Sequence, residues 1–303
     1  MRGGRVRRLR PRAAALVVAL FSGAALLAGC ALPDDPPPDV AVTGDSGAAP
    51  TITYVTPLTV DEPFRKVLWE GAGPEVVDGQ PILLDYWLEN ATDATLVRES
   101  YSSNPTSQLL SQEDLGAALY ETIKGHRVGA RLLQVVPAEG DTSATSYPTV
   151  AVVDILPTRA DGQAVTPAEG LPAVRLDDTG APSITPVKGE PPVDLVVQPL
   201  QRGPGRQVVG TDTVTVQYTG WNWAGEEFDT TWNSSLPISF SLQDVPAWSE
   251  ALVDQTVGSQ VLLIVPPKYN LGVTQSEELS GQTVVFVVDI LDARSPDEAP
   301  PAN

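Results

Sequence analysis

The sequence predicts an α+β protein made of two similar blocks, each with several antiparallel strands and one short helix. Short segments in which apolar and polar residues alternate indicate the strands, and each block holds one helix-start signal. The same order of segments occurs twice, so the 303 residues indicate a duplicated fold behind an N-terminal leader.

The leader has the pattern of an export signal. Residues 1–12 hold six Arg and no acidic residue, and a short apolar run follows them. This order is typical of a secretory signal peptide, which we assign to residues 1–29. The tetrapeptide LAGC (27–30) resembles the lipobox of bacterial lipoproteins, in which the cysteine is diacylated. The resemblance implies lipidation at Cys30, and a plain signal peptide with a chance cysteine is the alternative.

Charge and residue counts exclude several kinds of site. The formal charge is −19, and removal of residues 1–29 leaves 13 basic and 38 acidic residues, a net charge of −25. Nucleic acid needs basic patches, so we expect no nucleic-acid partner. One Cys and one His exclude an internal disulfide, a thiolate zinc site and a multi-histidine metal site. We expect no metal, no cofactor, and a monomer that its lipid anchors at the extracytoplasmic face of the cell membrane.

Composition divides the exported chain. Segments rich in Pro, Gly and Asp without sustained periodicity predict disorder or linkers. Within the linker, LPAVRL (171–176) is a candidate for a short strand docked on a neighbour. The predicted parts are a disordered tether at 30–51, a first block at 52–157, a linker at 158–192, a second block at 193–293 and a disordered tail at 294–303.

Local patterns place the elements. Val214, Val216 and Tyr218 alternate with polar residues, which predicts a half-buried strand. Pro246 opens a helix predicted at 246–254. Further strands are predicted at 225–232, at 238–242 from the alternation of Ile238, Phe240 and Leu242, and in the apolar runs 261–267 and 283–291.

The first block repeats this order. Ser111, with Asp114 three residues later, predicts the N-terminus of a helix that runs through Lys124. The aligned segments are 78–87 with 210–220, 118–137 with 247–266 and 150–157 with 285–292, and Tyr86 pairs with Tyr218.

Six motifs follow one another in the second block: QYTG (217–220), EEFDTTW (226–232), LPISFSL (236–242), VPAWSEAL (245–252), VGSQVLLIVPPKYNLG (257–272) and TVVFVVDIL (283–291). In this order they resemble the FKBP-type peptidyl-prolyl cis-trans isomerase family. In that family such elements form a bent antiparallel sheet wrapped around one short helix, with an apolar pocket between them. The resemblance implies two FKBP-like domains, of which the second is an isomerase.

The resemblance also implies the site residues. Tyr218, Phe228 and Phe286 match aromatic wall positions, Trp248 matches the pocket floor, and Asp229 matches the acidic residue near the bound carbonyl. Val245 matches the residue whose backbone N–H holds the substrate. The other implied substrate contacts are Ile238, Phe240, Tyr269 and Leu271, the last standing where the family usually has Tyr.

Such a site needs no nucleophile, metal or cofactor. Rotation about a peptide bond meets a barrier of about 18–20 kcal/mol, which comes from C–N resonance. The twisted transition state has lost that resonance and much of its charge separation, so a dry apolar pocket favours it over the planar amide.

The first block has lost the matching residues. Val97-Arg98 stands near the Phe-Asp position, and Leu119 aligns with Trp248. We therefore predict an inactive copy that serves as a spacer or a protein-binding surface.

The predicted function is prolyl isomerisation in proline-containing proteins that fold after export. The alternative is a catalytically weak peptide-binding or chaperone lipoprotein of the cell envelope. A structural envelope protein is a third class, and it predicts no peptide binding by either block.

Overall fold

The computed structural model describes residues 38–138, 147–232, 236–269, 271, 279 and 281–296. The predicted signal peptide and Cys30 lie outside these residues, as does the predicted tail from residue 297 onward. The chain divides into residues 1–36 and residues 37–303, and all described residues belong to the second unit. Among them, no helix is long and apolar enough to cross a membrane.

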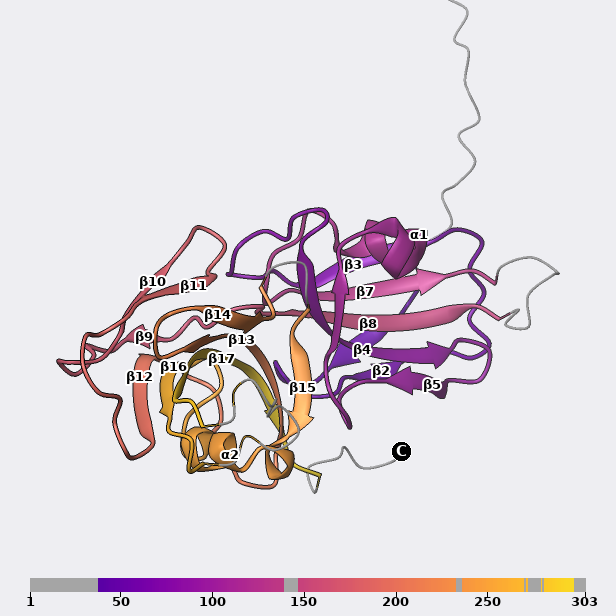
Figure 1. The fold of residues 1–303 in the computed structure, drawn as a ribbon. Coiled ribbons are helices and arrows are strands. Elements are labelled where there is room, and N and C mark those ends of the chain that lie inside the picture. Colours follow the sequence, from indigo (N-terminus) through magenta and orange to yellow (C-terminus); the bar gives the residue numbers. More distant parts are fainter. Residues whose placement is uncertain are drawn as a thin grey trace, which may run out of the picture. The chain divides into compact units, whose positions relative to one another are not determined.

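Two large antiparallel sheets dominate the described residues (Figure 1). The N-terminal sheet has the order β3-β7-β8-β4-β5, and β6 pairs with β4. Its strands are β3 (Phe64–Trp69), β4 (Pro81–Asn90), β5 (Thr95–Glu99), β6 (Thr106–Leu109), β7 (Arg131–Val136) and β8 (Thr149–Leu156).

The C-terminal sheet has the order β14-β13-β17-β16-β12-β9, and β15 pairs with β13. Apart from β9, the order matches that of the N-terminal sheet when it is read from the opposite edge: β12-β16-β17-β13-β14 corresponds to β3-β7-β8-β4-β5. β15 likewise corresponds to β6. Its strands are β9 (Gln163–Ala164), β12 (Val196–Arg202), β13 (Thr213–Asn222), β14 (Glu227–Thr230), β15 (Ile238–Ser241), β16 (Gln260–Val265) and β17 (Val284–Arg294).

The two α-helices begin where the sequence predicts. α1 (Gln112–Ile123) starts after Ser111, whose hydroxyl accepts a hydrogen bond from the Asp114 N–H at 3.1 Å. α2 (Pro246–Leu252) starts with Pro246, which has no N–H to satisfy. The 3₁₀ helix η1 (Leu242–Asp244) leads into α2. Sheets with few helices confirm the α+β class.

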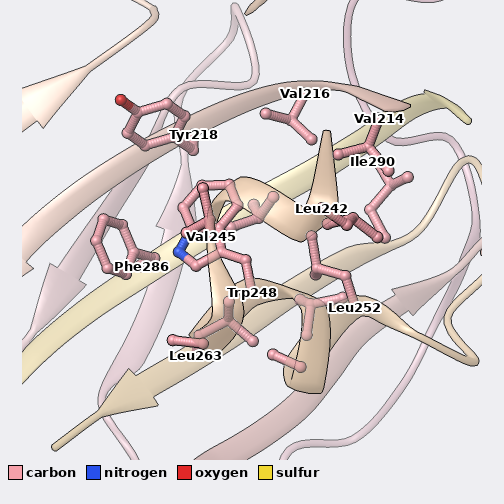
Figure 2. Packing of buried hydrophobic residues seen from close by; sticks show 14 of the residues in the cluster. Val214, Val216, Tyr218, Leu242, Val245, Trp248, Leu252, Leu263, Phe286 and Ile290 are labelled. Carbon is pink, nitrogen blue, oxygen red and sulfur yellow. The ribbon is translucent and has the colours of Figure 1, made fainter. Parts of the chain in front are cut away.

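The core of the C-terminal half lies between α2 and the sheet that curves around it (Figure 1). Figure 2 shows Val214 and Val216 of β13 pointing to the same side as Tyr218, toward Trp248 and Leu252 of α2. The period of two along the strand therefore supplies one wall of this core, as the alternation predicts.

A half-buried β13 would expose its second face to solvent, and this prediction is wrong. The polar residues Thr215, Gln217 and Thr219 are each at most 2% exposed, so the strand is covered on both sides. Trp221, which also lies on β13, belongs to a second apolar cluster, and Val174 and Ile184 pack against that cluster.

Part of the cover on this face comes from the predicted linker, 158–192. Its strands β10 (Ala173–Leu176) and β11 (Pro182–Thr185) form a hairpin, and β9 adds to the C-terminal sheet. The Ala160 N–H donates to Asp289 Oδ2 at 2.7 Å, which fixes the segment to β17. The candidate strand LPAVRL coincides with β10. A hairpin that packs on an existing sheet needs few apolar residues. Its high Pro and Gly content therefore resembles that of a linker.

The described residues of the predicted tether and of the predicted tail are ordered, so the prediction of disorder is wrong for them. Within the predicted tether, β1 (Ala41–Thr43) pairs with β2 (Thr51–Thr53), and Val40 is buried in a cluster with residues of β7 and β8. At the C-terminus, Arg294 still belongs to β17, and the Ser295 hydroxyl donates to Asp212 Oδ1 at 2.5 Å. Specific polar contacts of this kind leave no compositional signal.

Candidate functional site

The site is built around Tyr218, which lies near the middle of β13. Tyr218 is 8% exposed, and its backbone is fixed on both sides by Thr231. The Tyr218 N–H donates to Thr231 Oγ1 at 2.9 Å, and the Thr231 N–H donates to the Tyr218 carbonyl at 3.0 Å. These two hydrogen bonds join β13 to the residue that follows β14, so the backbone position from which the Tyr218 ring projects is fixed.

Five rings form what we call the aromatic cluster: Tyr218, Phe228, Phe240, Trp248 and Phe286. The Trp248 ring centroid lies 5.3 Å from those of Tyr218, Phe240 and Phe286, and Phe228 lies 5.7 Å from Phe286. All these contacts are edge-to-face, a geometry worth about 0.5–1.5 kcal/mol per pair beyond area burial. Figure 2 shows Tyr218 and Phe286 next to Trp248, and the Tyr218 and Phe286 ring centroids lie 6.1 Å apart. The structure thus brings together every aromatic residue that the sequence analysis assigned, apart from Tyr269.

Asp229 lies on β14 opposite Gly220 of β13. Its carboxylate accepts a hydrogen bond from the Tyr218 hydroxyl. Burial, and then the neighbouring carboxylate, raise the pKa of the Tyr218 phenol, so this group stays a protonated donor. The exposed Asp229 side chain therefore places a negative charge at the rim of an otherwise apolar cluster.

Gly220 is the residue that the sequence analysis did not single out. A Cβ placed there would lie 2.7 Å from Phe228 Cζ and 2.8 Å from Phe286 Cε1. Both distances are shorter than real Cβ atoms show, so only glycine lets the two rings meet over the β13 backbone. The Tyr-Thr-Gly motif holds the signal, because it places glycine two residues after a core tyrosine in a strand.

The cluster is buried at Trp248 and open at its edge. Trp248 is 4% exposed, whereas Phe228 is 37% and Ile238 is 40% exposed. Large exposed apolar side chains that continue a buried cluster are typical of a surface that binds apolar groups. Trp248 Nε1 is buried and has no hydrogen-bond partner among the described residues, so a donor lies in the floor of this surface.

The remaining assigned residues lie around the same core. Val245 is 2% exposed, and its N–H donates to the Leu242 carbonyl at 3.3 Å, which is long for such a bond. Tyr269 packs against the core cluster with the Lys268 ammonium 5.2 Å from its ring centroid. Leu271 is 4% exposed inside that cluster, so it acts there as packing.

The N-terminal sheet keeps the strand pairing and the tyrosine, Tyr86, but lacks the other rings of the cluster. Arg98 lies opposite Leu88 in the pairing of β4 with β5, the place that Asp229 takes opposite Gly220. Its guanidinium lies 5.7 Å from the Tyr86 ring centroid, so a cation stands where the other sheet has a carboxylate. Leu88 also faces Ala151, whereas Gly220 faces Phe286.

Comparison with known proteins identifies the second sheet. Residues 205–291 match the family model of the FKBP-type peptidyl-prolyl cis-trans isomerases. A probable FK506-binding protein of Corynebacterium glutamicum is 34% identical over 115 residues, which cover 37% of this chain and 98% of that protein. The FK506-binding protein of Streptomyces anulatus is 33% identical over 110 residues, which cover 34% of this chain and 89% of that protein.

Longer relatives match in part. The isomerase FkpA of Escherichia coli K12 is 34% identical over 102 residues, which cover 33% of this chain and 38% of that protein. The crystal structure of Escherichia coli FkpA has a TM-score of 0.32 and 30% identity, with 43% of this chain and 54% of that chain covered.

Proposed function

The chain belongs to the FKBP-type peptidyl-prolyl cis-trans isomerase family, and on that premise we propose that its C-terminal half isomerises prolyl bonds in exported proteins. The observation that supports this most directly is the aromatic cluster, which meets the exposed Phe228 and Ile238 at its rim. A prolyl ring is apolar and fits such a surface, while the flanking carbonyls remain polar.

The chemistry follows from the surroundings of the bound amide. Uncatalysed exchange of X–Pro bonds takes tens to hundreds of seconds, because rotation must break C–N resonance. A twisted amide is less polar along C–N than a planar one, so burial against Trp248 and Phe286 lowers its free energy relative to the ground state. Each tenfold gain in rate needs about 1.4 kcal/mol of this preference.

Asp229 has an orienting role in this proposal. Its carboxylate holds the Tyr218 hydroxyl, and its charge faces the carbon of a prolyl carbonyl bound at the rim. The Val245 N–H lies at the start of α2 and can be shared with a substrate oxygen. No covalent bond forms or breaks in this mechanism, since only a rotation is catalysed.

The test is a protease-coupled isomerisation assay on the purified chain. We expect Asp229→Asn and Phe228→Leu each to lower kcat/KM, with little change in melting temperature, because both changes nearly preserve size. Arg98→Asn is the matched control in the N-terminal half and should leave the rate unchanged. If the rate falls with Arg98→Asn and not with Asp229→Asn, the active site lies in the N-terminal half and the proposal is wrong.

We propose further that the chain holds two FKBP-like domains and is anchored by a diacylglycerol on Cys30. The shared strand order of the two sheets supports the duplication, and the loss of rings at Val97, Leu119 and Ala151 supports an inactive first copy. The lone Cys at the end of the leader supports the anchor. Mass spectrometry of the membrane fraction should find the adduct on Cys30, and an unmodified cysteine there contradicts the anchor.

A further inference from the structure

The strand that carries Phe228 and Asp229 lies at an edge of the C-terminal sheet. Among the described strands, β14 pairs only with β13, so its other side has no neighbouring strand. A short edge strand with one partner is held less firmly than a central strand. Contacts at the two ends of β14 therefore matter for where Phe228 and Asp229 lie.

The turn that leads into β14 rests on the chain that leaves the β10–β11 hairpin. Trp223 Nε1 donates to the Gly189 carbonyl at 3.0 Å. A Cβ placed on Gly225 would lie 2.3 Å from Pro186 Cγ and 3.2 Å from its Cδ, so the proline ring touches the backbone of the turn. Two separate contacts thus hold the start of the strand.

The residue that follows the end of β14 by two positions, Trp232, rests on the same hairpin. A Cβ placed on Gly180 would lie 3.3 Å from Trp232 Cη2 and 3.4 Å from its Cζ3. Gly180 lies in the hairpin turn, where Asp177 Oδ1 accepts from the N–H groups of Thr179, Gly180 and Ala181. A turn that is fixed by its own hydrogen bonds therefore supports the chain beyond β14.

The hairpin that makes these contacts is itself docked on the sheet. Val174 and Ile184 pack against an apolar cluster that contains Trp221 of β13 and Val287 of β17. Trp221 and Val287 each follow a residue of the site, Gly220 and Phe286, and successive side chains of a strand point to opposite faces. The hairpin thus backs the sheet on the face opposite to the aromatic cluster.

The N-terminal sheet carries the same kind of hairpin. Val42 pairs with Ile52 in β1–β2, and Val174 pairs with Ile184 in β10–β11. Val42 and Ile52 pack on β7 and β8, as Val174 and Ile184 pack on β16 and β17. The hairpins share the segments GAAPTIT (47–53) and GAPSIT (180–185). The repetition indicates that each hairpin belongs to the sheet that follows it and is no mere connection.

We propose that residues 173–189, which we call the arm, position the isomerase site by holding both ends of β14. Trp223 and Trp232 are the positioning residues through which the arm acts on Phe228 and Asp229, and none of the arm's own residues belongs to the aromatic cluster. The inference rests on the proposed isomerase function. A misplacement of about 1 Å at a positioned group can cost about 100-fold in rate, so a loosened β14 lowers the rate without unfolding the chain.

The test compares variants of the full chain in the protease-coupled assay, at a temperature where every variant is folded. Trp223→Phe keeps a ring and removes the N–H that reaches Gly189, and Ile184→Ala loosens the hairpin on the sheet. We expect each to lower kcat/KM about tenfold. Amide hydrogen exchange across β14 should become faster in both variants.

Matched variants in the N-terminal half separate positioning from stability. Ile52→Ala loosens the corresponding hairpin there, and Trp87→Phe removes an indole N–H that donates to Glu89 Oε1 at 2.8 Å. Both should lower the melting temperature. Neither should change kcat/KM, because neither residue contacts the chain around β14.

Two results of the rate measurement overturn the proposal. One is an unchanged kcat/KM in both Trp223→Phe and Ile184→Ala while their melting temperatures fall, which makes the arm purely structural. The other is an equal loss of kcat/KM in Ile52→Ala. If Ile184→Ala fails to fold, the comparison of Trp223→Phe with Trp87→Phe decides.

An inactive native chain would instead contradict the isomerase function. Hydrogen exchange then decides whether the arm positions β14. Faster exchange across β14 in Trp223→Phe, with no such change in Trp87→Phe, supports the positioning role, and unchanged exchange in Trp223→Phe overturns it.

Discussion

Gly220→Ala is the sharpest test of how the aromatic cluster is built. The added Cβ would lie 2.7 and 2.9 Å from two atoms of Phe228 and 2.8 Å from Phe286. Phe286 is 4% exposed and packed on three sides by rings, whereas Phe228 is 37% exposed and can rotate outward. We therefore expect Phe228 to leave its contact with Phe286.

The size of the effect follows from that difference. Overpacking of a core costs about 1–3 kcal/mol, and rotation of a ring at the surface relieves part of it, so we expect a loss of stability of about 1 kcal/mol. A misplacement of about 1 Å at a positioned group can cost about 100-fold in rate. A fall in kcat/KM of about 10- to 100-fold corresponds to about 1.4–2.8 kcal/mol of transition-state free energy.

The assay is protease-coupled isomerisation, with thermal unfolding measured on the same samples. Gly210→Ala is the matched control, because a Cβ there would lie 3.8 and 4.0 Å from its nearest neighbours. In a Phe228→Leu background, Gly220→Ala should cost less than in the native chain, since the clash acts through the ring. An unchanged kcat/KM in Gly220→Ala, or an equal loss in Gly210→Ala, refutes the reasoning.

Two further predictions concern stability. Burial raises the pKa of Asp289 from 3.8 to about 6. The unfolded chain therefore loses this proton first, so stability falls by about 3 kcal/mol as pH rises through that window. Asp289→Asn should remove this slope, read from urea unfolding curves at several pH values. Arg294 Nη2 lies 2.6 Å from Asp85 Oδ2, and Asp85 is 1% exposed. Arg294→Met strands that buried charge and should lower the free energy of unfolding by about 3–5 kcal/mol, whereas the exposed Arg175→Met should change it little; equal effects would contradict the role of this ion pair.

The sequence predicts what depends on local signals. Ser111 and Pro246 mark the starts of the two helices correctly, because a cap and a missing N–H act within one turn. The aromatic positions of the cluster follow from motif order. The close approach at Gly220 does not, because the two rings that fill the space come from other strands. Nor does the burial of Trp221 on the outer face of β13, since the hairpin that packs against its cluster looks like a linker in composition.

The pairing of Leu88 with Ala151, where the other sheet pairs Gly220 with Phe286, has an evolutionary consequence. A phenylalanine at 151 would meet the leucine side chain, and a glycine at 88 would leave space beside a small alanine. Each single step lowers stability without giving back a working surface, so selection opposes both orders of change. Under the duplication proposed above, this repacking opposes a stepwise gain of the aromatic cluster by the N-terminal sheet.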